Sequence, residues 1–405
     1  MRSRFVRDVE RRDMRGPCSL IAVALSLSGN LSTEPALCAE TVEEARAKAL
    51  EVLKSDAPLE QKAAACRGLA RFGDKDCVPV LAGMLGDEKL AHMARYALEP
   101  IPDKSVDEAL RAALDRLDGK LLVGAIGSIG VRRDPAAVES LGKHLGSSVG
   151  DVVRTAAIAL GQIGTAAAGK TLLEALKDAT GDNVSWIGDG LLTCGANLAA
   201  AGRQGEAKEL YDGLLARNPP VRIRAAALRG LVLCDRSNGA KLLTGMLHDR
   251  ELVVFAMALR VAAEMKDEQV TGVLVSEVAK LPADRVVAVM GVLGQRADKA
   301  ALPALLEMTK KGDRSVRVEA IRAAAEIGDA SVFPVLVDLI EEKDVDAAVK
   351  REAIAGILSI AERRPKKQHA GATKAALEKV AKAASDDPAV RKRAEGLLKQ
   401  FGEEN

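Results

Sequence analysis

Apolar residues along most of the chain recur three and four positions apart, which is the spacing of one face of an α-helix. The clearest case is residues 151–176, DVVRTAAIALGQIGTAAAGKTLLEAL, where one amphipathic helix stops at GQIG and a shorter one follows. The same two-helix pattern returns at residues 59–85, 118–145, 219–247, 282–308 and 313–340, with a final half-unit at 386–402. The pattern predicts about ten helical hairpins, stacked at intervals of about thirty residues.

The ends of the predicted helices carry the residues that such ends require. Carboxylates precede or open the first helices, where they accept orphan amide hydrogens. These are Asp151, Asp313 and Asp387, and Asp134-Pro135 and Pro388 add a proline at the start of a helix. Glycines at the first-helix ends are predicted to be left-handed caps, at Gly73, Gly130, Gly164 and Gly328.

Arginines recur in the opening turn of the first helices, at Arg154, Arg222, Arg317 and Arg391. We expect them to stack on the preceding unit or pair with its acids, which is a structural role. The glycines of LLVGAIGSIGVRRD (residues 121–134) fit the same pattern, with Gly127 as a close-packing position and Gly130 as the cap.

The units resemble HEAT repeats, in particular the short bacterial kind also called PBS-lyase HEAT-like repeats. The resemblance covers roughly residues 57–402. It is carried by Asp151, Arg154, Ala156, Ala157, Leu160, Gly161, Ile163, Gly164 and their counterparts in the other units. It implies an all-α fold, a right-handed α-solenoid of stacked hairpins with a concave inner surface.

One irregular region is expected within an otherwise continuous solenoid. Residues 177–186, which include Trp186, are rich in turn formers and are predicted to form a longer loop. Residues 191–220 resemble a tetratricopeptide repeat through Gly195, Ala207, Tyr211 and Pro219. The expected organisation is a capping helix in 40–56, HEAT-like repeats in 57–180, the loop and tetratricopeptide-like hairpin in 181–220, and HEAT-like repeats with a C-terminal cap in 221–405.

Residues 1–39 differ from the rest of the chain and are predicted to be a signal peptide. Six arginines precede the apolar run Cys18–Leu27, and small residues follow at ALCAE, residues 36–40. Cleavage after Ala39 predicts an exported protein, periplasmic or extracellular. Translation starting at Met1 or at Met14 both remain open, as does a buried or disordered N-terminal helix.

Charge and cysteine content narrow the function classes. Without residues 1–39 the basic and acidic residues are equal in number, and aromatic residues make up 2% of the chain. Nucleic-acid binding is therefore not expected, because it needs a basic groove. The apolar run is too short to span a membrane. Disulfides are permitted among Cys66, Cys77, Cys194 and Cys234, although buried thiols are favoured.

Motifs for bond-making chemistry are weak. The histidines His92, His144, His248 and His369 lie in separate units, which does not predict a metal site. Residues 164–171, GTAAAGKT, satisfy the phosphate-loop pattern, but they follow a predicted helix where that loop follows a strand. No catalytic residue and no cofactor are predicted. Near the carboxyl end, residues 361–374 are predicted to be a solvated basic loop.

The most distinctive polar stretch is residues 88–110. His92, Arg95, Tyr96 and Glu99 share one helix face, and Arg132 and Arg133 lie at the corresponding turn of the next unit, where the repeat pattern does not require them. The stretch resembles a secreted bacterial subgroup of HEAT-repeat proteins without an assigned activity. The six residues are the candidate partner-binding patch. A packing and ion-pair network between repeats is the alternative.

Taken together, these features predict a non-enzymatic scaffold, a monomer that binds a protein partner of unknown identity along its concave face. The alternative is a lyase-like enzyme or enzyme subunit that holds a small molecule. An apolar pocket with converging charged groups near Tyr96 or Trp186 would favour that alternative.

Overall fold

The computed structural model describes residues 41–363 and 370–402, and within these ranges it contains twenty-two α-helices and no strand. Its described residues from Arg46 onward belong to one compact unit, Arg46–Asn405. This is the predicted all-α solenoid. The predicted signal peptide lies outside the described residues. The first described helix is α1 (Val42–Lys54), which lies within residues 40–56, the range predicted for an N-terminal capping helix.

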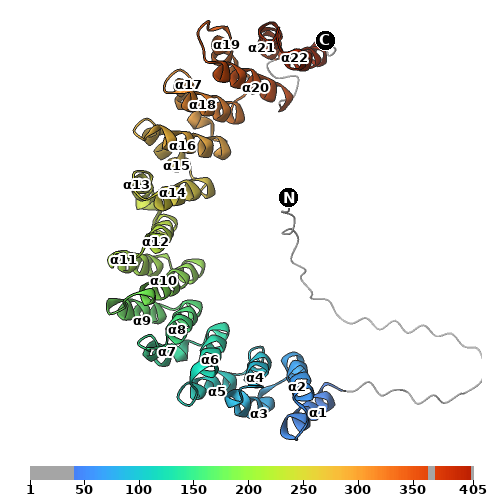
Figure 1. Cartoon of the computed structure of the whole chain (residues 1–405), viewed down its shortest axis with the longest axis vertical. Helices are drawn as coiled ribbons and strands as arrows, with labels where there is room; N and C mark the ends of the chain where they lie inside the picture. The colour runs from blue at the N-terminus through green and yellow to red at the C-terminus, as the bar shows by residue number, and fades with distance from the viewer. Residues whose placement is uncertain (1–40, 364–369, 403–405) are drawn as a thin grey trace, which may run out of the picture. The chain divides into compact units, whose positions relative to one another are not determined.

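The even-numbered helices form one layer, in which each contacts the next along the chain (Figure 1). They are α2 (Leu59–Phe72), α4 (Ala91–Leu98), α6 (Gly119–Arg132), α8 (Gly150–Ile163), α10 (Asp182–Ala200), α12 (Val221–Cys234), α14 (Leu252–Glu264), α16 (Ala283–Arg296), α18 (Arg314–Ile327), α20 (Ala347–Arg363) and α22 (Pro388–Gly402). Their outer surface is called the even face below.

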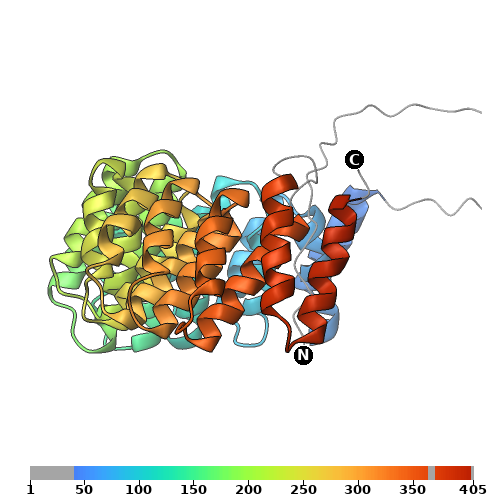
Figure 2. The same ribbon diagram turned by 90° about the horizontal axis from the view of Figure 1, so that it is seen from above.

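The odd-numbered helices form the second layer. After α1 they are α3 (Val78–Gly83), α5 (Lys104–Leu114), α7 (Val138–His144), α9 (Ala166–Lys177), α11 (Gln204–Leu215), α13 (Arg236–Leu247), α15 (Glu268–Val278), α17 (Leu302–Met308), α19 (Phe333–Glu341) and α21 (Ala370–Ala383). Viewed at right angles to Figure 1, the helices of the Arg46–Asn405 unit stand side by side (Figure 2).

Several odd-numbered helices begin with a short 3-10 turn that is capped by an aspartate. Asp134, for example, accepts a hydrogen bond from the Ala136 amide at 3.0 Å, and Pro135 follows it, as predicted. The equivalent caps are Asp74, Asp298 and Asp329. Each cap satisfies amide hydrogens that have no partner within the helix.

The core between the two layers consists of small and aliphatic side chains in two clusters that meet at α12. Ile223 and Leu231 belong to the first cluster, and Ala225 and Val232 of the same helix to the second. Burial is thus continuous between neighbours and local along the chain, as expected of a repeat protein.

The prediction of glycine caps is correct only at Gly164, whose φ is 66°. Gly73 and Gly328 end their helices in extended conformations. Gly130 lies inside α6, and the left-handed cap of that helix is Arg133, at φ 55°. The helix α6 therefore continues two residues beyond the predicted cap, and the true cap lies three residues beyond it.

The interpretation of Gly127 as a close-packing position is also wrong. A Cβ built at Gly127 meets nothing within 4 Å, whereas a Cβ at Gly130 would lie 2.8 Å from the Cα of Ala159 in α8. Gly130 corresponds to Gly161, which sits equally close to α10 and also precedes its left-handed cap by three residues. Gly130 lets α6 and α8 approach each other, and Gly127 leaves an open space.

The predicted roles of capping and arginine residues are confirmed in part. Asp313 and Asp387 cap their helices, but Asp151 lies inside α8, which has no side-chain cap. Arg222 pairs with Asp189 of the preceding unit at 2.9 Å, as expected. The interpretation of Arg391 is wrong, because it pairs with Glu395 of its own helix.

The predicted long loop before the tetratricopeptide-like segment is only four residues, 178–181, because α10 already begins at Asp182. Trp186 lies within α10 and packs against the hydrophobic core. In the hairpin of α10 and α11, the buried Tyr211 ring occupies the space that a Cβ at Gly195 or Gly230 would need. A tyrosine thus fits between two helices because both of them offer glycine there.

The structure also bears on the phosphate-loop-like segment, the predicted basic loop and the cysteines. In GTAAAGKT, Gly164 ends α8 and Lys170 lies within α9, so this segment is not a phosphate loop in the structure. Residues 364–369, the middle of the predicted basic loop, lie outside the described residues. None of the four described cysteines is paired, and burial raises the pKa of Cys66 to about 11.

Candidate protein-binding groove

A groove with a volume of about 340 Å³ crosses the even face from α4 to α8. We call it the α4–α8 groove. Its walls are helix side chains and its floor includes two glycines of α6. It is lined by His92, Arg95, Tyr96, Glu99, Gly124, Gly127, Ser128, Val131, Ile158 and Gln162.

One wall of the groove is the polar face of α4. His92, Arg95, Tyr96 and Glu99 lie three and four residues apart, so they project from the same side of the helix. The opposite side of α4 is buried through Ala94, Ala97 and Leu98. The structure thus brings together the four α4 residues of the candidate patch.

The floor of the groove exists because α6 carries glycine at two exposed positions. A Cβ built at Gly124 would lie 2.2 Å from the guanidinium carbon of Arg95, so the guanidinium rests on bare backbone. Gly127, one turn later, has open space above it. Any side chain at Gly124 would displace Arg95, and a large one at Gly127 would fill the groove.

Apolar side chains are unusually exposed around this floor. Tyr96 is 51% exposed, Val131 57% and Ile158 41%. Each comes from a different helix of the even layer, so their meeting depends on how the repeats stack. An exposed apolar cluster that is bordered by polar groups is typical of an interaction site.

Arg95 carries a charge that no carboxylate of the described residues neutralises by a hydrogen bond. Its guanidinium is half-buried, and this burial lowers the pKa of Arg95 below its usual range, an effect that the nearby Glu99 partly opposes. The Glu99 carboxylate accepts a hydrogen bond from the Ser128 hydroxyl at 2.7 Å. A half-buried cation without a bonded anion is a strong donor for an incoming carboxylate.

Arginines farther along the even face are arranged differently. On the helices from α10 to α22, several arginines form ion pairs with a carboxylate of the neighbouring even-numbered helix. These pairs are Arg222–Asp189 (2.9 Å), Arg229–Glu264 (2.6 Å), Arg322–Glu352 (3.2 Å) and Arg393–Glu362 (2.7 Å). The contrast marks Arg95 as available for a partner.

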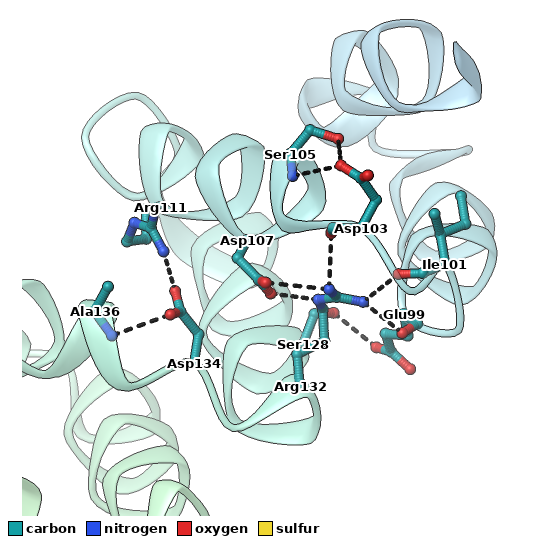
Figure 3. A network of polar contacts seen from close by, with 10 residues as sticks. All are labelled: Glu99, Ile101, Asp103, Ser105, Asp107, Arg111, Ser128, Arg132, Asp134 and Ala136. Carbon is teal, nitrogen blue, oxygen red and sulfur yellow. Dashed lines mark hydrogen bonds and ion pairs between the residues drawn. The ribbon is translucent and has the colours of Figure 1, made fainter. Parts of the chain in front are cut away.

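Arg132 belongs to a different site. Its side chain is 11% exposed and donates to the backbone carbonyls of Glu99, Ile101 and Asp103 and to the Asp107 carboxylate (Figure 3). It therefore ties the end of α6 to the turn of the preceding unit, in agreement with the alternative of a packing network. Arg133 is exposed, forms the left-handed cap of α6, and does not line the groove.

The expectation that the repeat pattern does not require Arg132 is wrong. Arg296 is the last residue of α16, as Arg132 is of α6, and it donates to the carbonyls of Ala262, Met265 and Asp267. For both arginines the acceptors include the residues 31 and 29 positions earlier. The turns GVRRD (residues 130–134) and GQRAD (residues 294–298) hide this correspondence, because the residue that forms the left-handed cap is Arg133 in the first and Ala297 in the second.

Sequence reasoning missed the residues that α6 and α8 contribute to the groove. Val131, Ile158 and Gln162 read as ordinary positions of amphipathic helices, and only the exposure of the first two singles them out. Gly124 offered a signal, because a glycine within a helix suggests close packing. Its neighbour in space, Arg95, is 29 residues away and could not be inferred.

The groove has no arrangement that suggests catalysis. The Ser128 side chain is 1% exposed, and its hydroxyl hydrogen is directed to Glu99, which does not activate it as an accessible nucleophile. Among the described residues, no three side chains of histidine, cysteine, aspartate or glutamate are grouped so as to hold a metal ion. In the same residues, no helix is long and apolar enough to cross a membrane.

Comparison with known proteins identifies the repeat. A family model of HEAT repeats matches residues 106–188 and 279–358, which include the α6 and α8 parts of the groove. These two segments are therefore similar to HEAT repeats. No curated protein matches the chain.

Solved structures agree on the fold. Kap121p bound to Pho4p is 12% identical, with a TM-score of 0.53, over 89% of this chain and 51% of that chain. Kap95p, from a structure with RanGDP, is 12% identical, with a TM-score of 0.50, over 90% and 56%. The chain thus spans about half the length of these karyopherins, and at this identity the likeness shows a HEAT solenoid fold alone.

Proposed function

We propose that this protein is a non-enzymatic scaffold that binds a protein partner along its even face, with the α4–α8 groove as the centre of the contact. The observation that carries the proposal is the exposed apolar cluster of Tyr96, Val131 and Ile158 on a glycine floor. Protein–protein interfaces commonly have an apolar centre that is surrounded by polar groups. In this proposal the even face takes the role of the concave face that the sequence predicts.

The use of the whole face as a binding surface is supported by its construction. Each helical pair contributes one short stretch of surface, so an extended partner would contact many repeats at once. Kap121p and Kap95p, which share the fold, are seen with the protein partners Pho4p and RanGDP. Shape and polar complementarity would provide the affinity, and no covalent step is required.

Site-specific photo-crosslinking tests this proposal. A photoreactive amino acid replaces Val131 in the groove, and a matched variant carries it at Glu139, an exposed position of α7 in the odd layer. We expect a partner from the native cell extract to be captured at position 131 and not at 139. Equal capture at both positions, or capture at neither, would contradict the proposal.

A small-molecule site is the second candidate. It is favoured by the convergence of Arg95, His92 and Glu99 beside Tyr96, because small-molecule sites combine a few polar groups with an apolar lining. Mass spectrometry of the purified native protein distinguishes the two. A bound small molecule that is lost in the Gly127→Leu variant, without any captured protein, would favour this second function.

We further propose that the protein is exported after removal of residues 1–39, that it acts as a monomer, and that residues 191–220 form a tetratricopeptide-like unit. The basic start and apolar run support export, and the fit of Tyr211 between Gly195 and Gly230 supports the last of these. Determining the amino-terminal residue of the protein from its native source tests the cleavage after Ala39. An intact amino terminus would contradict it.

A further inference from the structure

We infer that the α4–α8 groove recognises the side-chain carboxylate of an aspartate or glutamate next to an aliphatic residue, in an extended segment of the partner. This inference rests on the proposed function and names the chemistry that the groove selects. The carboxylate would bind to the guanidinium of Arg95. The aliphatic neighbour would lie against Tyr96, Val131 and Ile158.

The geometry of Arg95 fits this chemistry. Its guanidinium lies flat enough against α6 that a Cβ at Gly124 would come within 2.2–2.6 Å of its carbon and both terminal nitrogens. The helix therefore restrains the guanidinium on one side and leaves its other side toward the groove. A restrained guanidinium loses less entropy on forming a two-pronged bond with a carboxylate than a mobile lysine does.

The charged groups of the groove favour a partner that places one carboxylate beside Arg95. Glu99, the acid on the same wall, already accepts the Ser128 hydroxyl. His92 and Gln162 add further hydrogen-bonding groups to the border. A nucleic acid backbone would need several cations in a row, and the groove offers one beside three apolar side chains.

An internal segment fits better than a chain terminus. The groove is lined by residues of three successive even helices, so a bound chain would cross α4, α6 and α8. Exposed apolar side chains lie on α4, α6 and α8 alike, so they extend along the whole of that path. A passing chain can use all of these contacts, and the carboxylate then comes from a side chain.

Selection from a random-peptide phage library on the full-length protein tests the inference. We expect enriched peptides to share an acidic residue beside leucine, isoleucine or valine. A library that yields no enrichment would contradict the proposed function of the groove. Enriched peptides without an acidic residue would overturn the carboxylate inference and leave the proposed function standing.

Synthetic versions of the enriched peptides, amidated at the carboxyl end, define the contact. Replacing the acid by its amide should weaken binding to the wild type by about tenfold or more, the effect of losing a charged hydrogen bond. The same replacement should have little effect on the Arg95→Gln variant. Arg222→Gln is the matched control, because Arg222 lies on the even face but pairs with Asp189, and it should bind as the wild type does.

Two further measurements test whether Arg95 is the contact and whether something else occupies the groove. Gly124→Ala displaces Arg95 without touching α8, so it should weaken acidic peptides if Arg95 is the contact and retain them if it is not. Crosslinking from position 131 in peptide-free protein reports other occupants. A product joined to a second copy, or to another segment of the same chain, would overturn the inference.

Discussion

Gly127 and Gly130 lie one turn apart on α6, and the structure predicts opposite effects of replacing each by alanine. In the middle of a helix, alanine is intrinsically favoured over glycine by about 1 kcal/mol. At Gly127 nothing lies within 4 Å of the new Cβ, so the whole gain should appear in the free energy of unfolding. Gly127→Ala is therefore expected to stabilise the protein by about 0.5–1 kcal/mol.

At Gly130 the new methyl group would lie 2.8 Å from the Cα of Ala159 and 3.0 Å from its Cβ. These atoms belong to the backbone and first side-chain carbon of α8, so relief requires the two helices to separate. Overpacking of this kind costs about 1–3 kcal/mol. The intrinsic gain from alanine is the same in both variants and cancels when they are compared. Gly130→Ala should therefore be less stable than Gly127→Ala by about the same 1–3 kcal/mol.

Urea unfolding followed by far-ultraviolet circular dichroism measures both variants against the wild type. Unfolding midpoints are compared directly, because a long repeat protein need not unfold in one step. The expected order of midpoints is Gly127→Ala, wild type, Gly130→Ala. If Gly130→Ala were as stable as Gly127→Ala, the close approach of α6 and α8 through Gly130 would be refuted.

Three further predictions concern the arginine network, acid stability and thiol reactivity. Arg132→Met should lower the free energy of unfolding by about 3 kcal/mol, because it leaves backbone carbonyls and the carboxylate of Asp107 without a partner. Arg133→Gly should raise it by up to about 1 kcal/mol, because glycine adopts the left-handed conformation of this residue without strain. Thermal unfolding of the two variants measures these opposite shifts. The hydrogen bond from Lys299 is the main reason that the pKa of the Asp329 carboxylate lies below its ordinary 3.8. The ionised carboxylate therefore stabilises the fold above pH 3.8, and this stabilisation is lost as the pH falls. The loss of stability at acid pH should be less steep in Asp329→Asn than in the wild type, and an unchanged steepness would contradict this. Alkylation followed by mass spectrometry should label the partly exposed Cys234 before the buried Cys66, and the reverse order would mean that the core opens differently.

Local features of the chain were predictable from the sequence alone. Helical periodicity, aspartate caps and proline starts act over a few residues, so the hairpins, the cap at Asp134 and the first turn at Pro388 could be inferred directly. The grouping of His92, Arg95, Tyr96 and Glu99 on one wall followed from helix geometry in the same way. The HEAT-like repeat pattern, and with it the solenoid, followed from the recurrence of these local units.

The tertiary structure decided the features that depend on which helices touch. Glycine serves both as a helix cap and as a close-packing residue, and the sequence does not distinguish the two, so Gly130 was placed three residues away from the true cap at Arg133. Arg132 and Arg133 are neighbours in sequence, yet one is buried against carbonyls about thirty residues earlier and the other is exposed. Local propensity predicts that each helix forms, but contacts between repeats determine that Arg132 supports the stack and that Arg95 remains open to a partner.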